Sequence, residues 1–238
     1  KCYLIAGSHD YSVSGKTFLD VLEKAGLCEI CKYEENEQEV ILKPMIYKTF
    51  HIYGYPGKKS SLEIPSLKKL KINEPYEKNF RILMLHTAIT EAISLPDGIV
   101  DSISLSELPK ADYYALGHLH VDFNHSHVIY SGPIFPNNFE ELETLKHGSF
   151  IIVEVNNELA LKRIPIKFYE TISFKIDVDG LTAEEAKTKI LKFINRDVAN
   201  KIITLRIYGV LKSGKIKDID FKNIYSRLDG SFTFLNNT

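Results

Sequence analysis

Four of the eight histidines lie within ten positions of the segment "YYALGHLHVDFNHSHVIYSG". They are His118, His120, His125 and His127. Imidazole is the side chain whose charge changes near neutral pH, and it is the commonest metal ligand. In an extended chain, residues two apart point to the same side, so His118 and His120 would share one face while Leu119 turns toward the core. This spacing predicts a pair that reaches one metal ion or two adjacent ions.

Two further apolar strands are expected to end in polar groups. The run "CYLIAG" leads into Ser8, His9 and Asp10, and the run "FRILMLH", expected to be buried on both faces, ends at His86. In α/β folds, sites assemble at the C-terminal edge of the sheet. A lone histidine is more often a capping or surface residue. Three strand ends of this kind together favour a metal site.

A second set of residues has a composition that suits contacts to nucleic-acid phosphates. The segment "GKKSSLEIPSLKKLK" contains Lys58, Lys59, Lys68, Lys69 and Lys71, and the polar hairpin-like stretch "DFNHSHV" contains Asn124, His125 and His127. The lysines are interpreted either as a solvated loop or as DNA phosphate contacts, with equal weight. The two hairpin histidines are expected to face solvent or a ligand rather than a metal, because exposure is the default for loop residues.

Composition narrows the classes of protein. The 238 residues are 44% hydrophobic and 26% charged, as in ordinary globular proteins, and the net charge of −1 provides no global basic field. No apolar stretch is long enough to span a membrane and no signal peptide opens the chain. The three cysteines do not make a disulfide framework, so a cytoplasmic protein is expected. Cys28 and Cys31 form a lone C-x-x-C, which favours ordinary buried thiols over a zinc or redox site.

The element pattern predicts an α/β chain with two domains. A helix is expected over "SGKTFLDVLEKAGL", strands over residues 28–55, and a loop with one short helix over residues 56–79. From about residue 167 the pattern is βαβαβ, and its first helix has Thr182 as N-cap and Glu185 three residues later. The predicted domains are residues 1–164 and 165–238. Both ends look cut, which predicts a piece of a longer protein.

The segments "GSHD", "LMLH" and "GHLH", in this order, resemble the later motifs of the calcineurin-like metallophosphoesterases. That family has Gly-Asn-His-Asp/Glu, then a strand-end histidine, then Gly-His-x-His. The segment "VIYSGPIFPNNFEELE", followed by a βαβ-type domain, resembles a narrower group, the Mre-eleven and SbcD nucleases of DNA double-strand-break repair. The resemblance extends over nearly the whole chain.

The resemblance implies a four-layered αββα phosphoesterase sandwich that holds two manganese ions, with a small C-terminal capping domain that helps to select DNA. By motif position, His86 and His118 match ligands of the second metal and His120 matches a ligand of the first. Ser8 stands where the family has an asparagine ligand. His9 matches the histidine beside the scissile phosphate, which stabilises charge or donates a proton to the leaving oxygen.

Two departures from the family pattern affect this expectation. The hydroxyl of Ser8 is shorter than an asparagine side chain and a weaker donor. The early motifs Asp-x-His and Gly-Asp, which supply the bridging carboxylate, are absent and are expected upstream of Lys1. The sequence therefore predicts that this chain alone does not hold a competent dinuclear centre, whereas its full-length parent does.

The expected function is that of a manganese-dependent DNA exonuclease or endonuclease in double-strand-break end processing. The resemblance implies a homodimer that works with an SMC-like ATPase, Rad-fifty or SbcC. Two alternatives stay open: a phosphodiesterase for small molecules, and a non-catalytic DNA-binding scaffold module. The βαβαβ domain argues against the small-molecule enzyme, which has less use for a DNA-sized cap.

Overall fold

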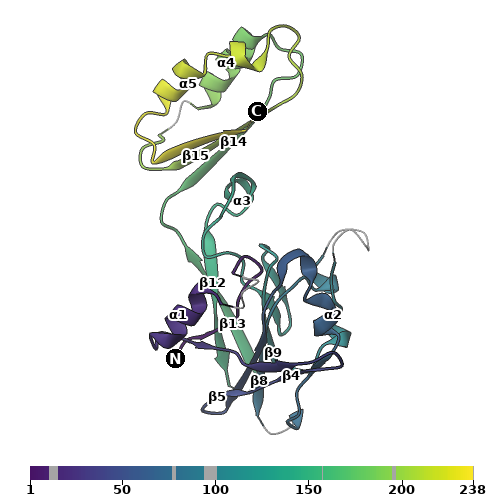
Figure 1. Ribbon diagram of the computed structural model, residues 1–238. Helices are drawn as coiled ribbons and strands as arrows, with labels where there is room; N and C mark the ends of the chain where they lie inside the picture. Colours follow the sequence, from purple (N-terminus) through teal and green to yellow (C-terminus); the bar gives the residue numbers. More distant parts are fainter. Residues whose placement is uncertain (11–15, 77–78, 94–100, 157, 195–196, 238) are drawn as a thin grey trace. The chain divides into compact units, whose positions relative to one another are not determined.

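The computed structural model describes residues 1–10, 16–76, 79–93, 101–156, 158–194 and 197–237. The chain forms two compact units (Figure 1). Unit 1 consists of Lys1–Gly132 and Glu154–Ala160, and unit 2 consists of Pro133–Val153 and Leu161–Thr238. This division differs from the predicted boundary between residues 164 and 165. Compact units are not functional domains, so the nuclease and capping assignments stay predictions.

The main sheet of unit 1 has six strands in the order β10-β11-β9-β8-β6-β5. Figure 1 labels three of them, β9, β8 and β5. Four neighbouring strands are parallel: β11 (Val128–Tyr130), β9 (Tyr113–Gly117), β8 (Phe80–His86) and β6 (Phe50–Tyr55). At the edges, β10 (Phe123–His125) and β5 (Met45–Tyr47) pair antiparallel with their neighbours. Because β8 and β9 are parallel, their C-terminal ends meet, and His86 is the register partner of Gly117.

The strand β8 is buried less than the sequence predicted. Leu83 and Leu85 are fully buried, whereas Ile82 and Met84, which point to the opposite face, are half-buried. The prediction of burial on both faces is therefore wrong for one of them. The buried face joins the core of unit 1, whose largest fully buried side chains are Tyr53, Tyr55 and Tyr130.

Smaller elements complete unit 1. β1 (Tyr3–Leu4) pairs with β2 (Glu29–Ile30), and β3 (Tyr33–Glu35), β4 (Val40–Leu42) and β7 (Leu70–Lys71) form a three-stranded sheet. The short helix expected within residues 56–79 is α2 (Ile64–Leu67). Single 3₁₀ turns cover Lys59–Ser61, Thr90–Ala92 and Leu105–Glu107. The sequence did not predict β7, because two residues carry no periodicity.

The first predicted helix is confirmed as α1 (Phe18–Lys24). It begins with a capping box in which the side chains of Thr17 and Asp20 bond each other's backbone amides. It ends at Gly26, whose φ of +74° allows the paired bonds of a Schellman motif. The apolar face of α1 is largely exposed, with Phe18 90% accessible.

Unit 2 contains the predicted βαβαβ string. β14 (Thr171–Asp177), β15 (Ile202–Tyr208) and β16 (Thr233–Asn237) form a parallel sheet, and α4 (Ala183–Phe193) and α5 (Phe221–Arg227) pack together on one face (Figure 1). The predicted capping box of Thr182 and Glu185 at the start of α4 is confirmed. A two-stranded sheet of β12 (Gly148–Val155) and β13 (Leu159–Ile166) precedes this string.

The opposite face of the β14–β16 sheet carries α3 (Phe139–Thr144). Glu143 of α3 is buried and pairs with Arg206 of β15, and the Arg206 guanidinium lies 5.0 Å from the ring centroid of Phe139. These contacts explain why residues 133–153 belong to unit 2. A long-range ion pair leaves no local sequence pattern, so this part of the division was missed.

None of the described helices combines the length and the apolar character that crossing a membrane requires. The mixed α/β class expected from the sequence is confirmed, with a six-stranded sheet in unit 1 and a three-stranded parallel sheet in unit 2.

Candidate functional site

His86 is the centre of a histidine cluster at the C-terminal edge of the main sheet. It ends β8, and His118 follows the end of β9, so the two imidazole rings lie edge to face with centroids 5.3 Å apart. The hydroxyl oxygen of Ser8 lies 3.4 Å from Nε2 of His86. The structure thus brings together Ser8, His86 and His118, which the sequence placed at three separate strand ends.

Three glycines form a cradle for the His86 ring. A Cβ atom at Gly7 or Gly117 would lie 3.0 Å from an atom of the ring, and at Gly57 only 2.5 Å. Any side chain at these positions would therefore push the imidazole aside. Gly57 belongs to the turn after β6, and the sequence analysis did not single it out.

Electrostatics keep the central imidazoles neutral. Burial, and then the nearby His118, lower the pKa of His86 to about 4, and His120 and His9 act in the same direction. Burial also lowers the pKa of His118. Near neutral pH both rings therefore keep a free lone pair, which is the form that ligates metals. The same interactions show that His9 and His120 lie within electrostatic reach of His86.

The conformation at His118 differs from the extended chain expected for the Gly-His-x-His segment. β9 ends at Gly117, and His118 has a φ of +94°, in a region that side chains rarely adopt. The prediction that an extended chain orients His118 and His120 is therefore wrong, although Leu119 packs against the core as predicted. Such strain at a side chain of a candidate site is typical of functional positions.

The turn after β1 holds the other predicted residues. The carboxylate of Asp10 accepts a hydrogen bond of 3.0 Å from the backbone amide of Gly7, and the amide of Asp10 donates back to the Gly7 carbonyl. This closes a tight turn around Ser8 and His9. His9 is exposed, as a residue that meets a substrate must be.

A buried carboxylate that the sequence analysis missed lies beside the cluster. Glu63 is 2% exposed and accepts hydrogen bonds from the backbone amide of Lys58, at 3.0 Å, and from the hydroxyl of Thr87, at 3.2 Å. It also counteracts the lowering of the His118 pKa. It lies in a segment rich in lysine, serine and proline that reads as a loop, so no local pattern marked it as buried.

A pocket of about 260 Å³ opens next to His86. It is lined by β1 and by the half-buried face of β8 and β9, including Met84 and Gly117, together with Ser131.

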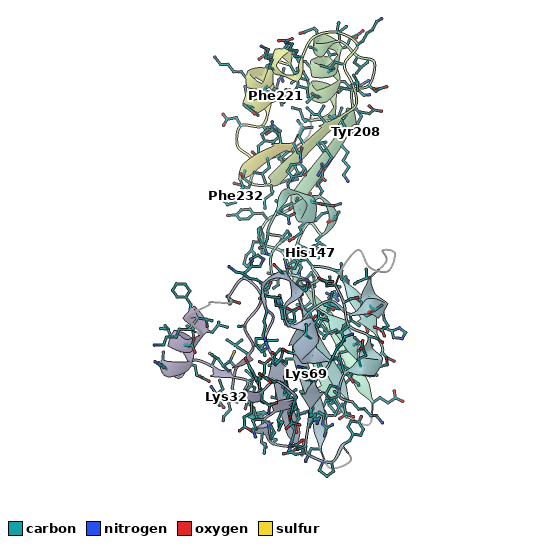
Figure 2. The ribbon with its side chains drawn as sticks, turned by 45° about the vertical axis from the view of Figure 1, so that its right-hand side comes forward. Lys32, Lys69, His147, Tyr208, Phe221 and Phe232 are labelled. Atoms are coloured by element: carbon teal, nitrogen blue, oxygen red, sulfur yellow. The ribbon has the colours of Figure 1, made fainter. Side chains whose placement is uncertain are left out.

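The predicted DNA-contacting lysines differ in how they are engaged. Lys58 bonds Glu35 and Ser66, each at 3.3 Å, and its amine lies 5.4 Å from the ring centroid of Tyr55. Lys68 pairs with Glu107, Lys71 pairs with Glu39, and Lys69 (Figure 2) donates to the carbonyl of Glu37. Among the described residues, Lys59 is exposed and forms no ion pair. Intramolecular partners therefore compete with DNA at all these lysines except Lys59.

The hairpin that follows the cluster is confirmed. Asn124 and His125 end β10, Ser126 takes a left-handed φ of +57° at the turn, and His127 precedes β11. All four side chains are exposed. The His127 ring lies 5.5 Å from that of Tyr114. The expectation that the hairpin histidines face solvent is confirmed, and their contact with DNA stays a prediction.

The side chains of the cluster are of the kinds that bind divalent metals, but they are too few to complete a metal site. The neutral imidazoles of His86 and His118, with the Ser8 hydroxyl, are acceptable ligands. Over the parts of the chain that the structure describes, however, no three His, Cys, Asp or Glu side chains gather closely enough to hold an ion. The two thiols of the C-x-x-C segment offer no alternative, because Cys28 and Cys31 are buried and burial raises the pKa of Cys31 to about 12.

Comparison with known proteins supports the resemblance seen in the motifs. No family model matches the chain. The chain is 28% identical over 219 residues to the DNA double-strand break repair protein Mre11 of Methanocaldococcus jannaschii, which covers 83% of this chain and 54% of that protein. It is 26% identical over 176 residues to the protein of the same name from Archaeoglobus fulgidus, which covers 67% of this chain and 37% of that protein. The chain thus spans about half, or less, of the length of these relatives, and it resembles an Mre11-type nuclease with a metallophosphoesterase fold.

Proposed function

We propose, from the similarity to the Mre11 proteins and from the histidine cluster, that the full-length protein is a manganese-dependent DNA nuclease of double-strand-break repair. The observation that carries the proposal is the meeting of Ser8, His86 and His118 at one edge of a parallel sheet. Each residue comes from a different strand end, at the motif position where a phosphoesterase would place a ligand. A chance gathering of surface histidines would not require three glycines packed around one ring.

In this proposal His86, His118 and Ser8 hold one divalent cation and His120 contributes to a second. When bound, two cations supply an activated water and neutralise the charge of the phosphodiester. The contribution of the chain itself is to present neutral imidazoles, which burial enforces at His86 and His118. The carboxylate ligands are proposed to come from Asp-x-His and Gly-Asp motifs of the full-length protein.

His9 is proposed to act on the leaving group. It is exposed, it follows Ser8 directly, and its charge acts on His86. A histidine at this place can donate a proton to the leaving oxygen or stabilise its developing charge. The turn closed by Gly7 and Asp10 fixes the backbone on both sides of it.

Contacts to DNA are proposed for both units. In unit 1 the exposed residues Lys59, Asn124, His125 and His127 suit phosphate contacts. In unit 2 the ring of Phe232 is exposed and stacks on Tyr169 with centroids 3.9 Å apart (Figure 2). Exposed aromatic rings provide stacking surfaces for single-stranded bases, which supports the proposed role of residues 165–238 as a DNA-selecting cap.

The proposed partners are an SMC-like ATPase, Rad-fifty or SbcC, and a second copy of the protein. The resemblance to the Mre-eleven group is the support for both. The exposed apolar side chains of α1, Phe18 and Val21, together with Leu27 just after it, also suit a protein interface. The second copy is proposed to cover this face.

A non-catalytic DNA-binding scaffold is the second candidate, because the described residues alone do not complete a metal site. Calorimetric titration with Mn²⁺ separates the two. The nuclease proposal expects two sites in the full-length protein, incomplete binding in this chain alone, and loss of one site in the full-length His86→Gln variant. Absence of Mn²⁺ binding by the full-length protein would favour the scaffold, and two tight sites in this chain alone would contradict the need for further carboxylates.

A further inference from the structure

We propose that Glu63 is a positioning residue that fixes the imidazole of His86 at the end of β8. Glu63 immediately precedes α2 in the chain and is not among the residues that the motif comparison assigns to the site. Its side chain joins two segments that adjoin His86. The proposal rests on the proposed function only for the catalytic use of His86, not for its geometry.

The first segment is the turn after β6. Oε2 of Glu63 accepts a hydrogen bond from the backbone amide of Lys58, and a Cβ atom at the preceding residue, Gly57, would lie only 2.5 Å from the His86 ring. The amide of Gly57 in turn donates to the carbonyl of Ala6, just before the Ser8 turn. Glu63 therefore holds in place Gly57, the glycine of the cradle at which a Cβ atom would come closest to the His86 ring.

The second segment is the chain directly after His86. Oε1 of Glu63 accepts the hydroxyl of Thr87, which is fully buried. One carboxylate thus holds both the turn beside the ring and the residue that follows His86. Displacing either one would change where the ring points.

The burial of the Glu63 carboxylate is a further argument that this residue has a specific role. Glu63 is 2% exposed, and among the described residues it forms no ion pair. Burying a carboxylate without a cation is unfavourable, and at Glu63 the hydrogen bonds from the Lys58 amide and the Thr87 hydroxyl offset this cost. The two bonds join the turn that contains Gly57 to the residue directly after His86, so the geometry assigns Glu63 to the site.

The test uses the metal-free chain, labelled at its histidine rings, and records their proton–carbon correlation spectrum. The chain has eight histidines, and the signal of His86 is the one that disappears in His86→Gln. Three variants are compared: Glu63→Leu, which removes both hydrogen bonds, Thr87→Val, which removes one, and Glu63→Gln, which can accept from Lys58 and donate to Thr87. Thermal unfolding of each variant is measured in parallel.

We expect Glu63→Leu to shift the His86 signal by more than one linewidth, Thr87→Val to shift it less, and Glu63→Gln to leave it in place. The matched control is Glu74→Leu. Glu74 accepts hydrogen bonds from His51 and Tyr53 on β6, so this change should move the His51 signal and leave His86 unaffected.

An unmoved His86 signal in both Glu63→Leu and Thr87→Val would overturn the proposal. An equal shift of His86 in Glu74→Leu would also overturn it, because general loosening would then account for the effect. The spectrum requires neither metal nor DNA, so a shifted signal in a protein without nuclease activity would contradict the proposed function alone. In the active full-length enzyme, Glu63→Leu should lower kcat roughly 10- to 100-fold, as is usual for residues behind a metal ligand.

Discussion

The carboxylate of Glu143 and the guanidinium of Arg206 form an ion pair across 63 residues of sequence. Nε of Arg206 lies 2.9 Å and Nη2 2.8 Å from the same carboxylate oxygen. The Glu143 side chain is 2% exposed and that of Arg206 31%. Lys175 adds a longer contact of 3.8 Å. Because the carboxylate is desolvated, this pair fixes α3 to the sheet of unit 2.

Removing one partner should therefore destabilise unit 2 strongly. We expect Glu143→Ala to lower the free energy of unfolding by about 2–4 kcal/mol, since it leaves Arg206 without its buried partner. Hydrogen exchange of the α3 amides should accelerate roughly 30-fold or more at this cost. Glu184→Ala, which breaks an exposed pair with Lys187, should change stability by less than about 0.5 kcal/mol. Equal effects of the two changes would show that burial of Glu143 is unimportant.

The backbone of His118 stores strain that substitution can measure. His118→Ala and His118→Gly both remove the imidazole, but only glycine adopts a φ of +94° freely. We expect the glycine variant to be more stable than the alanine variant by about 1 kcal/mol in chemical denaturation. At Asn124, on strand β10, the order should be the reverse, because glycine weakens an extended strand. Greater stability of the alanine variant at His118 would mean that the site bears no strain.

Acid should weaken the cluster around Glu35. Burial alone would raise the pKa of Glu35, but hydrogen bonds from Ser66 and Tyr55 and the charge of Lys58 outweigh it and leave this pKa below its usual value. A carboxyl whose folded pKa is depressed stabilises the protein above its unfolded pKa, and this contribution is lost as the pH falls through the folded pKa. The stabilising contribution of Glu35 should therefore start to fall near pH 4.3 and should decrease further at lower pH.

The measurement is the free energy of unfolding from pH 7 to pH 3. Glu35→Gln should be less stable than the wild type at pH 7, and the difference should narrow below about pH 4.3. Glu34→Gln changes a neighbour on the same strand that is 69% exposed, and it should alter stability by less than about 0.5 kcal/mol throughout. If Glu35→Gln were less stable than the wild type by the same amount at every pH, the ionised carboxylate of Glu35 would not be the source of the stability.

Salt dependence of DNA binding should distinguish Lys59 from its neighbours. Lys59 is exposed and unpaired among the described residues, whereas Lys69 already bonds the Glu37 carbonyl. Loss of one phosphate contact reduces the slope of log affinity against log salt by about 0.9. We expect this change for Lys59→Ala and a smaller one for Lys69→Ala, measured by fluorescence anisotropy with the full-length protein. A larger change in slope for Lys69→Ala than for Lys59→Ala would indicate that Lys69, not Lys59, contacts the phosphate.

Local patterns predicted the elements well. The capping box at Thr182 and the hairpin around Ser126 depend on chemistry within a few residues, and both are present. The parallel βαβαβ string followed from helix and strand periods alone. The division into units could not be predicted in the same way, because the pair of Glu143 and Arg206 joins distant segments.

The candidate site was predictable only in part. Strand-end histidines identified His86 and His118, because parallel strands bring their ends to one edge. The left-handed backbone at His118, the cradle at Gly57 and the buried carboxylate of Glu63 depend on packing between segments far apart in the chain. No spacing rule reports such contacts.

The proposal that the histidine cluster belongs to a manganese-dependent DNA nuclease is tested most directly by hydrolysis of linear double-stranded DNA. The measurement is nucleotide release by the full-length protein with Mn²⁺, compared with its His86→Gln variant and, as a control, His127→Gln, which alters an exposed hairpin histidine outside the cluster. The account predicts Mn²⁺-dependent release by the wild type and by His127→Gln, and a loss of at least about 100-fold in His86→Gln, as expected when metal catalysis fails. Hydrolysis that persists unchanged in His86→Gln would contradict it.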